Sequence, residues 1–304
     1  TAGPDTHDGA GPDPAATEAF TAHRNLLFTV AYEMLGSAAD AEDVVQETWL
    51  RWAAVDLTAV RDRRAYLVRI TTRQALTRLR TLARRRETYV GAWLPEPLLT
   101  APDVADDVEL ADSVSTAVLL VLETLAPTER AVFVLREVFA VEYDEIAEAV
   151  GKSPAAVRQI AHRARAHVAA RRPRSSVSPA ETRRALAAFQ QAVETGDLSG
   201  LLGMLAPDVV LVGDGGGTRR TAKQPVTGFP QVARVLSAGL PALTTRARFA
   251  PLHINGHPAL LIRLDGETDN VLTVRMDDGL ITALYVVRNP EKLTRLDRET
   301  PMIR

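Results

Sequence analysis

The chain has 304 residues, 46% of them hydrophobic, no cysteine and a formal net charge of −2. This length predicts about two domains, or three small ones, and the apolar content excludes a wholly disordered chain. The lack of cysteine excludes disulfides, thiolate metal sites and a cysteine nucleophile. No apolar run approaches the roughly 20 residues of a membrane span. The N-terminal residues do not resemble a signal peptide, so we expect a cytoplasmic protein without a membrane partner.

The first part of the chain is predicted to be helical after a short tail. Residues 1–16 combine Gly, Pro and Asp with almost no apolar side chain, which indicates a disordered tail. Over residues 17–88 apolar side chains recur at helical spacing, so we expect one all-α domain. Its helices are expected at 17–35, 40–52 and 64–86, with a break at Gly36-Ser37 and a loop at 54–63.

A second helical domain is predicted after an acidic linker. Residues 89–108 contain three prolines, and residues 88–129 hold eight acids and no Lys or Arg. We therefore predict an extended acidic linker at 89–108 and an all-α domain at 109–172. A helix is expected from Glu109, followed by helices at 128–139, 143–150 and 154–170. Ser153 before Pro154 is a helix-start signal, and residues 173–179 indicate another linker.

The remaining residues follow a different pattern. Residues 180–296 are predicted to begin with helices at 179–195 and 198–205, followed by β-branched runs at 209–212, 259–264, 271–276 and 281–287. Asn-Gly and Asp-Gly pairs separate the later runs as hairpin turns would. Helices followed by antiparallel strands indicate an α+β fold, with residues 297–304 as a tail. His253 and His257 have no acidic cluster nearby, so we expect surface residues and no metal site.

The near-zero net charge conceals opposed segments. Residues 61–86 hold ten Arg and one acid, and residues 152–174 hold one Lys, six Arg and no acid. Two basic helices are the electrostatic footprint of phosphate contact. A solvated, arginine-rich helix face is the alternative for either segment alone, because 33 of the 36 basic residues in this chain are Arg.

The helices at 143–150 and 154–170 have the pattern of a helix-turn-helix. Gly151 permits the tight turn, and Val157, Ile160, Ala161 and Ala164 form one apolar stripe. The opposite face carries small, amide and basic side chains that suit a major groove. A structural helical hairpin is the alternative. The predicted DNA-binding residues are Ala155, Arg158, Gln159, His162, Arg163 and Arg165.

Three segments in this order resemble the extracytoplasmic-function (ECF) sigma factors. Residues 31–52, AYEMLGSAADAEDVVQETWLRW, are similar to the helix of that family that binds core RNA polymerase. Residues 64–80, RAYLVRITTRQALTRLR, resemble its promoter-melting and −10-reading segment. Residues 126–168 resemble its −35-reading domain, so the resemblance covers about half of the chain.

The resemblance implies an alternative sigma factor with RNA polymerase core and promoter DNA as partners, no enzyme activity and no cofactor. Val44, Val45 and Trp52 are expected in the core, and the loop at 54–63 is expected to take a flipped promoter base. The implied polymerase contacts are Asp40, Asp43, Gln46, Glu47 and Arg51. The implied −10 contacts are Arg61, Arg63, Arg64, Arg69, Arg73, Arg78 and Arg80, which cannot all face DNA from one helix. The helix-turn-helix residues would read the −35 element. The acidic linker is predicted either to mimic nucleic acid in the RNA exit region or to be an ordinary solvated linker.

Further motifs resemble the ECF subgroup with a fused SnoaL-like C-terminal domain. They are RRETYVGAWLPEPL at 85–98, DGGG at 214–217 and NPEKL at 289–293. The resemblance implies a cone-shaped α+β domain of the SnoaL and ketosteroid-isomerase type that regulates the sigma factor within the same chain. The glycines suit docking against the linker, although a structural turn is the alternative. The implied interdomain residues are Trp93, Leu94, Pro95, Glu96, Pro97, Asp214, Gly215, Gly216, Gly217, Asn289, Pro290 and Lys292.

Two other functions stay open at this point. One is a helix-turn-helix transcription factor that acts without a polymerase role and binds a small apolar ligand in its cone. The other is an isomerase- or cyclase-like enzyme fused to a DNA-binding domain, with Asp208 or Asp214 as general base. The first of these leaves residues 31–52, which resemble a polymerase-binding helix, unexplained.

Overall fold

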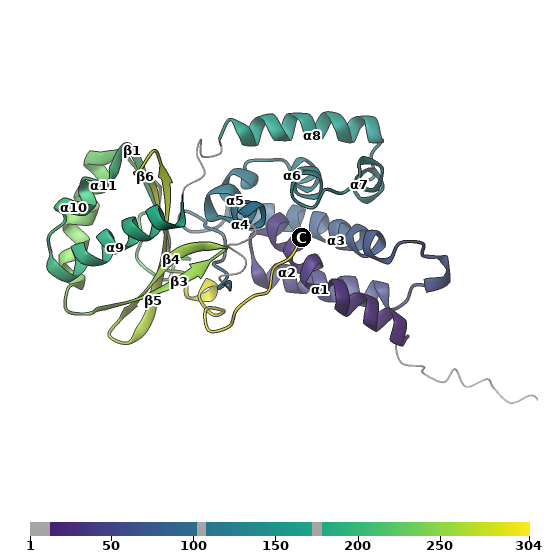
Figure 1. The fold of residues 1–304 in the computed structure, drawn as a ribbon, viewed down its shortest axis with the longest axis horizontal. Coiled ribbons are helices and arrows are strands. Elements are labelled where there is room, and N and C mark those ends of the chain that lie inside the picture. The colour runs from purple at the N-terminus through teal and green to yellow at the C-terminus, as the bar shows by residue number, and fades with distance from the viewer. Residues whose placement is uncertain (1–12, 102–107, 172–177) are drawn as a thin grey trace, which may run out of the picture.

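The computed structural model describes residues 13–101, 108–171 and 178–304. A helical part and a sheet-containing part lie side by side (Figure 1). Most of the predicted tail at 1–16 and of the predicted linker at 173–179 lies outside the described residues. The first helix, α1, begins at Pro14, so the prediction of a tail is wrong for residues 14–16.

The first domain is a three-helix unit of α1 (Pro14–Leu35), α2 (Ala38–Trp52) and α3 (Arg63–Glu87). α1 ends at Gly36, whose φ of +67° is the left-handed conformation that glycine adopts most easily. The Ser37 side chain then accepts a hydrogen bond from the Asp40 amide and caps α2. Val44, Val45 and Trp52 are buried, which confirms their predicted place in the core.

The second domain contains α4 (Val108–Val114), α5 (Thr116–Glu123), α6 (Pro127–Phe133), α7 (Tyr143–Val150) and α8 (Pro154–Ala169). The helix predicted at 128–139 ends at Phe133 and continues as a π-helical turn, Val134–Val138. Gly151 is left-handed between α7 and α8, and the Ser153 hydroxyl caps α8. The apolar stripe of α8 is buried, as predicted.

The C-terminal domain is an α+β unit built on one six-stranded sheet. Its helices are α9 (Pro179–Thr195), α10 (Ser199–Leu202) and α11 (Phe229–Gly239). Its strands are β1 (Leu205–Asp214), β2 (Val226–Thr227), β3 (Ala247–Ile254), β4 (His257–Leu264), β5 (Glu267–Asp277) and β6 (Leu280–Val287), in the order β2-β1-β6-β5-β4-β3. β1 and β6 run parallel, which corrects the expectation of antiparallel strands throughout, and α11, β2 and β3 had no clear sequence signal.

The two faces of the sheet have different neighbours. Apolar side chains on one face pack with those of α9, α10 and α11. On the other face, Val212 and Tyr285 pack with Leu94 of the linker and Leu120 of α5. Residues 89–101 of the linker thus lie between the sheet and the helical part, and Leu99 forms an isolated β-bridge with Ile254; residues 102–107 of the predicted linker lie outside the described residues.

The helical domains share one continuous apolar core, which also includes a residue from the end of the chain. Leu67 of the first domain and Leu135 of the second belong to the same buried cluster. Met302 is 4% exposed within it, and the Thr300 amide donates to the Leu99 carbonyl. Residues 297–304 are therefore packed against the helical part, which corrects the prediction of a tail.

Candidate interdomain site and nucleic-acid interface

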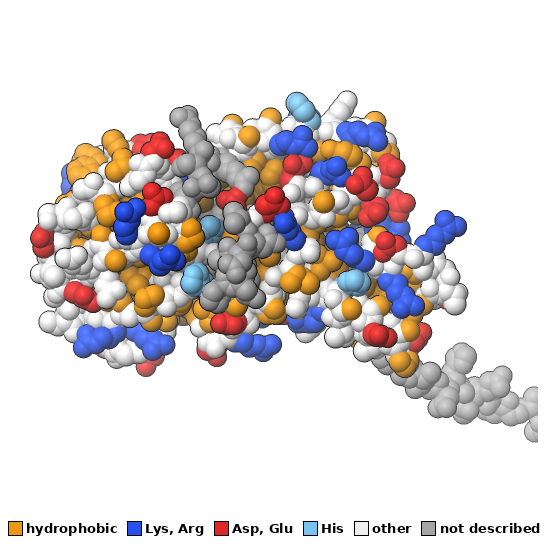
Figure 2. Space-filling model, viewed as in Figure 1, with side chains coloured by type: hydrophobic (Ala, Val, Ile, Leu, Met, Phe, Trp, Pro, Cys, Tyr) orange, Lys and Arg blue, Asp and Glu red, His pale blue; other side chains and the backbone are white. Residues whose placement is uncertain are grey.

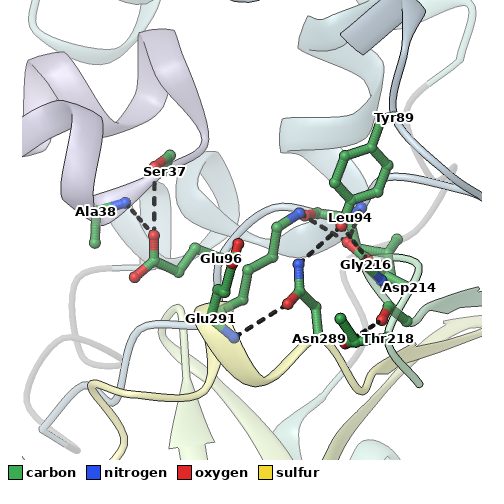
Figure 3. Close-up of polar contacts among 12 residues, drawn as sticks. Ser37, Ala38, Tyr89, Leu94, Glu96, Asp214, Gly216, Thr218, Asn289 and Glu291 are labelled. Atoms are coloured by element: carbon green, nitrogen blue, oxygen red, sulfur yellow. Dashed lines mark hydrogen bonds and ion pairs between the residues drawn. The ribbon is translucent and has the colours of Figure 1, made fainter. Parts of the chain in front are cut away.

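Asp214, at the end of β1, is the centre of a buried polar cluster that joins the linker to the C-terminal domain (Figure 3). Its side chain is fully buried. The carboxylate accepts hydrogen bonds from the Tyr89 hydroxyl at 2.5 Å, the Leu94 amide at 2.9 Å and the Gly216 amide at 3.1 Å. Lys292 Nζ forms an ion pair with it at 2.7 Å. A buried carboxylate that binds four donors has a structural role, because its hydrogen-bonding capacity is satisfied within the protein.

Lys292 and Asn289 contribute the other side of this cluster. Lys292 Nζ also donates to the Leu94 carbonyl at 2.6 Å and lies 4.3 Å from the centre of the Trp93 ring, a cation–π distance. Asn289 Nδ2 donates to the Tyr89 hydroxyl at 2.9 Å, while its oxygen caps the turn Pro290–Lys292. Pro290 of the NPEKL motif was also predicted as an interdomain residue, but it is exposed and makes none of these contacts.

The glycines after Asp214 are required by close approach. Gly216 and Gly217 have positive φ angles of +60° and +74°. A Cβ at Gly216 would lie 2.4 Å from the Asn289 side chain, and one at Gly215 would lie 2.1 Å from the Arg219 carbonyl. Both distances are far below van der Waals contact, so a side chain at Gly216 would disrupt the packing against Asn289 and one at Gly215 would disrupt the loop itself.

Tyr89 is part of this cluster, although it was not among the predicted site residues. Burial, followed by the hydrogen bond to Asp214, raises the pKa of its phenol, so the group acts as a neutral donor. The sequence offered one signal, because Tyr89 lies within the quoted motif at 85–98. Its distance of 125 residues from Asp214 concealed the contact.

The other end of the linker motif attaches to the first domain. The Glu96 carboxylate is nearly buried and accepts from the Ala38 amide at 2.7 Å, at the N-terminus of α2, where a negative charge is favoured. Burial nevertheless raises its pKa above the usual range. The Glu96 carbonyl accepts from the Tyr32 hydroxyl at 2.6 Å. Pro95 and Pro97 are buried on either side of Glu96.

Asn255, in the turn between β3 and β4, forms a second junction that sequence reasoning missed. Its side-chain oxygen accepts from the Leu98 amide at 2.9 Å, and its Nδ2 donates to the Tyr32 hydroxyl at 3.0 Å. The Asn-Gly pair was recognised as a turn, but its partners lie far away in the sequence. His257 beside it is not a simple surface residue, since its Nε2 lies 3.0 Å from the Ala111 carbonyl. Burial lowers its pKa.

The predicted polymerase-binding residues lie along one face of α2. Asp43, Gln46, Glu47 and Arg51 are exposed. Asp40 is less exposed and pairs with Arg78 of α3, which also contacts Asp43 at 2.8 Å. Arg78, predicted to contact the −10 element, is thus engaged with two of the predicted polymerase-binding acids.

The other predicted −10 residues divide into two groups. Arg61, Arg63, Arg64 and Arg80 are exposed. Arg69 and Arg73 instead face α7 of the second domain. Near them is a hollow of about 520 Å³ between α2, the following loop and α3. It is lined by Leu50, Arg51, Ala54, Val55, Tyr66, Ile70, Arg73 and Gln74.

The predicted −35 residues lie on the open face of α8. Arg158, Gln159, His162 and Arg163 line one shallow hollow of about 380 Å³. Ala155 is exposed on the same helix, and Arg165 pairs with Glu137 at 2.8 Å. Figure 2 shows basic and acidic side chains intermixed over the helical part. The residues of this hollow are brought together as the helical spacing predicted.

The two carboxylates that were considered as general bases have different surroundings. Asp208 is exposed on β1, and Asp214 is occupied by its four donors. Phe189, Leu272 and Leu284 belong to one buried apolar cluster between the sheet and its helices. Within the described ranges, no group of acidic, His or Cys side chains could hold a metal ion, and no helix is long and apolar enough to cross a membrane.

Comparison with known proteins identifies the helical part. Residues 19–85 match sigma-70 region 2, and residues 115–168 match sigma-70 region 4. These matches define a sigma-70-type transcription initiation factor. The whole chain extends beyond them, so longer relatives decide the particular family.

The ECF RNA polymerase sigma factor SigJ of Mycobacterium tuberculosis is 38% identical over 289 residues, covering 90% of this chain and 92% of SigJ. The probable ECF sigma factor SigI of the same organism is 33% identical, covering 94% and 97%. The crystal structure of SigJ matches with a TM-score of 0.73 at 34% identity, covering 92% of this chain and 98% of that one. The protein belongs to the ECF RNA polymerase sigma factors, with a SnoaL-like C-terminal domain.

Proposed function

We propose that this sigma factor is regulated in cis by docking of its C-terminal domain on the linker between its two sigma domains. The observation that carries the proposal is the Asp214 cluster, in which a buried carboxylate of the C-terminal domain binds Tyr89, Leu94 and Lys292. Leu94 and Leu98 of the linker are completely buried in this arrangement. A linker held in this way is unavailable to polymerase, so docking restrains initiation.

The proposal predicts the effect of releasing the linker. Run-off transcription with purified core polymerase compares the intact chain with a chain lacking residues 177–304 and with Asp214→Asn. Both changes are expected to alter transcript yield, and Asp214→Asn is expected to raise it. Asp208→Asn, an exposed change on the same strand, is the control. Unchanged yield from the truncated chain and from Asp214→Asn would argue against regulation in cis.

The promoter-reading roles follow from exposed basic surfaces. We assign −35 reading to Ala155, Arg158, Gln159, His162, Arg163 and Arg165 on α8, and polymerase binding to Asp40, Asp43, Gln46, Glu47 and Arg51 on α2. Arg78 pairs with Asp40 and Asp43. The other arginines of the 61–80 segment would hold the melted −10 strand: Arg61, Arg63, Arg64, Arg69, Arg73 and Arg80. The hollow at Tyr66 offers an aromatic and a basic side chain to a flipped base. A small apolar ligand of the cone remains a prediction.

Arg158 provides the test for −35 reading. Arg158→Ala in the holoenzyme is expected to weaken binding to the preferred promoter by roughly 1–3 kcal/mol if this side chain reads a base. Binding to scrambled duplex should change less. Equal loss on both duplexes would reassign Arg158 to phosphate contact, whereas no loss on either would remove it from the interface.

A further inference from the structure

Tyr143, the first residue of α7, lies among arginines of the helix-turn-helix domain. The guanidinium carbon of Arg136 lies 4.5 Å from the centre of the Tyr143 ring, and that of Arg158 lies 5.6 Å from it. Both distances are within the roughly 6 Å of a cation–π contact. Arg136 belongs to the π-helical turn Val134–Val138, whereas Arg158 is on α8. The ring therefore joins three segments of the domain.

A third arginine contacts the same tyrosine through its hydroxyl. Arg165 of α8 forms an ion pair with Glu137 at 2.8 Å. The hydrogen bond and charge of Glu137, followed by a hydrogen bond to Tyr143, raise the pKa of the Arg165 guanidinium. Glu137 lies in the π-helical turn, next to Arg136 in the sequence. Arg165 thus connects the Tyr143 hydroxyl to that turn, which limits the movement of the ring.

The two arginines on the ring differ in their other contacts. Arg136 NH1 donates to the Val141 carbonyl at 3.1 Å and lies 3.3 Å from the Glu142 carboxylate. Arg158 is exposed, and no carboxylate within the described part of the chain lies at ion-pair distance from it. The Tyr143 ring is thus the contact that orients Arg158, while the N–H groups of Arg158 stay available to a partner.

A ring contact suits an arginine that reads a base. A long side chain loses rotamer freedom when it binds, and an arginine that is already oriented loses less. An aromatic ring can stack on the flat face of a guanidinium, which leaves the N–H groups at its edge free to donate. Guanine presents two acceptors, N7 and O6, to two such donors in the major groove. An ion pair would instead occupy the donors that read the base.

We propose that Tyr143 is a positioning residue for −35 reading, whose ring holds the Arg158 guanidinium in the orientation that enters the major groove. Tyr143 acts through Arg158 and does not itself read a base. The inference rests on the proposed role of Arg158, and it adds a residue outside α8 to those that set promoter specificity. Two other roles are open to Tyr143: a phosphate contact through its hydroxyl, and packing alone, since its ring also contacts the apolar core.

Selection from random duplexes tests the proposal. The probe is a pool of linear duplexes with a randomised central segment, and the protein is holoenzyme that contains the full chain. Sequencing of the bound duplexes gives the base preferences of the unaltered chain, Arg158→Ala and Tyr143→Leu. The preference that Arg158→Ala loses marks the base that Arg158 reads. Tyr143→Leu should reduce this preference about two- to five-fold, as expected for an exposed cation–π contact, and leave the other positions unchanged.

Two control variants separate positioning from the other roles. Tyr143→Phe keeps the ring and should keep the preference at the base that Arg158 reads. Val150→Ala removes a half-buried apolar side chain from the same helix and should leave all preferences unchanged. If Tyr143→Leu lowers affinity for every sequence equally, as Val150→Ala would, Tyr143 has a packing role and the inference is overturned. An equal loss on every sequence in Tyr143→Phe would assign the hydroxyl to a phosphate and also overturn it.

The same data separate this inference from the proposed function. If Arg158→Ala leaves every base preference unchanged, Arg158 is not a base reader and both fail. If Arg158→Ala loses a preference that Tyr143→Leu retains, the role of Arg158 stands and positioning by Tyr143 is refuted. In the Arg158→Ala background, Tyr143→Leu should have no further effect on base preference.

The contact can also be measured in the unaltered chain, which does not require that Tyr143→Leu folds. Nuclear Overhauser contacts are expected between the aromatic protons of Tyr143 and the side chains of both Arg136 and Arg158. Arg158→Lys identifies the Arg158 signals by removing them. The Arg136 contact, which is the shorter one, serves as the positive control. Contacts to Arg136 without any to Arg158 would overturn the proposal.

Discussion

The Asp214 cluster and the outer face of α8 use the same kinds of side chain for opposite purposes. At Asp214, each charged or hydrogen-bonding group meets a partner from another segment, and the carboxylate is completely buried. On α8, Arg158, Gln159 and His162 lie together around an open hollow. Burial makes the first region a structural junction, while exposure leaves the second available to a partner. Charge alone would not have told these two regions apart.

Removing charge at the junction should produce the largest effect. Asp214→Asn leaves the buried Lys292 ammonium without its counter-ion, which is expected to cost about 3–5 kcal/mol. The cost should appear as a lower midpoint for denaturation of the C-terminal domain and as faster proteolysis of the linker. Asp208→Asn on the same strand is exposed and should change stability by less than about 0.5 kcal/mol. Similar losses for the two variants would contradict the contrast between buried and exposed groups.

Steric crowding at the junction should come next. A Cβ at Gly36 would lie 2.7 Å from Cη2 of Trp93, and Gly36 has a positive φ. Gly196 has a similar φ of +76° at a helix end but open space around it. Both changes to Ala incur the backbone strain, so Gly36→Ala should cost about 1–3 kcal/mol more than Gly196→Ala. Thermal denaturation and Trp fluorescence measure this difference, and equal costs would show that Trp93 does not pack tightly here.

Glu33 gives a prediction that depends on pH. Burial raises the pKa of its carboxyl from 4.5 to about 8. Because the folded state holds the proton more tightly than the unfolded state, the contribution of Glu33 to stability is lost as pH rises from about 5 through 8. Glu33→Gln removes this titration and should be the more stable form at pH 8.5, by roughly 1–3 kcal/mol. Denaturation at several pH values measures it.

The control for this prediction is Glu47→Gln on the exposed face of α2. It should change the free energy of unfolding by less than about 0.5 kcal/mol, because its side chain is exposed. A Glu33→Gln profile parallel to that of the original chain would mean that Glu33 titrates normally.

The sequence predicted elements with local signals and missed contacts between distant segments. α7 and α9 have the predicted bounds, because the apolar spacing and the cap residues of a helix lie within one stretch of chain. The parallel pairing of β1 with β6 had no local signal, because most of the C-terminal domain lies between the two strands in the sequence. β2 and α11 were also missed. β2 has only two residues, and α11 mixes apolar and polar side chains.

The site residues follow the same division. Arg158, Gln159 and His162 were grouped correctly because one helix arranges them. Tyr89 and Asn255 were missed because their partners are 125 and 223 residues away in the sequence. Arg69 and Arg73 were recognised as basic, but their contact with α7 depends on packing between two domains.

The smallest effect is expected where an ion pair has good geometry but no burial. Arg246 and Asp265 are joined by several hydrogen bonds, and the Arg246 guanidinium lowers the pKa of the Asp265 carboxyl. Both side chains are more than half exposed, so water competes for each group. Arg246→Ala should therefore change the free energy of unfolding by less than any of the changes above, as measured by urea denaturation. A loss approaching that of Asp214→Asn would mean that the number of contacts, and not their removal from water, distinguishes the two regions.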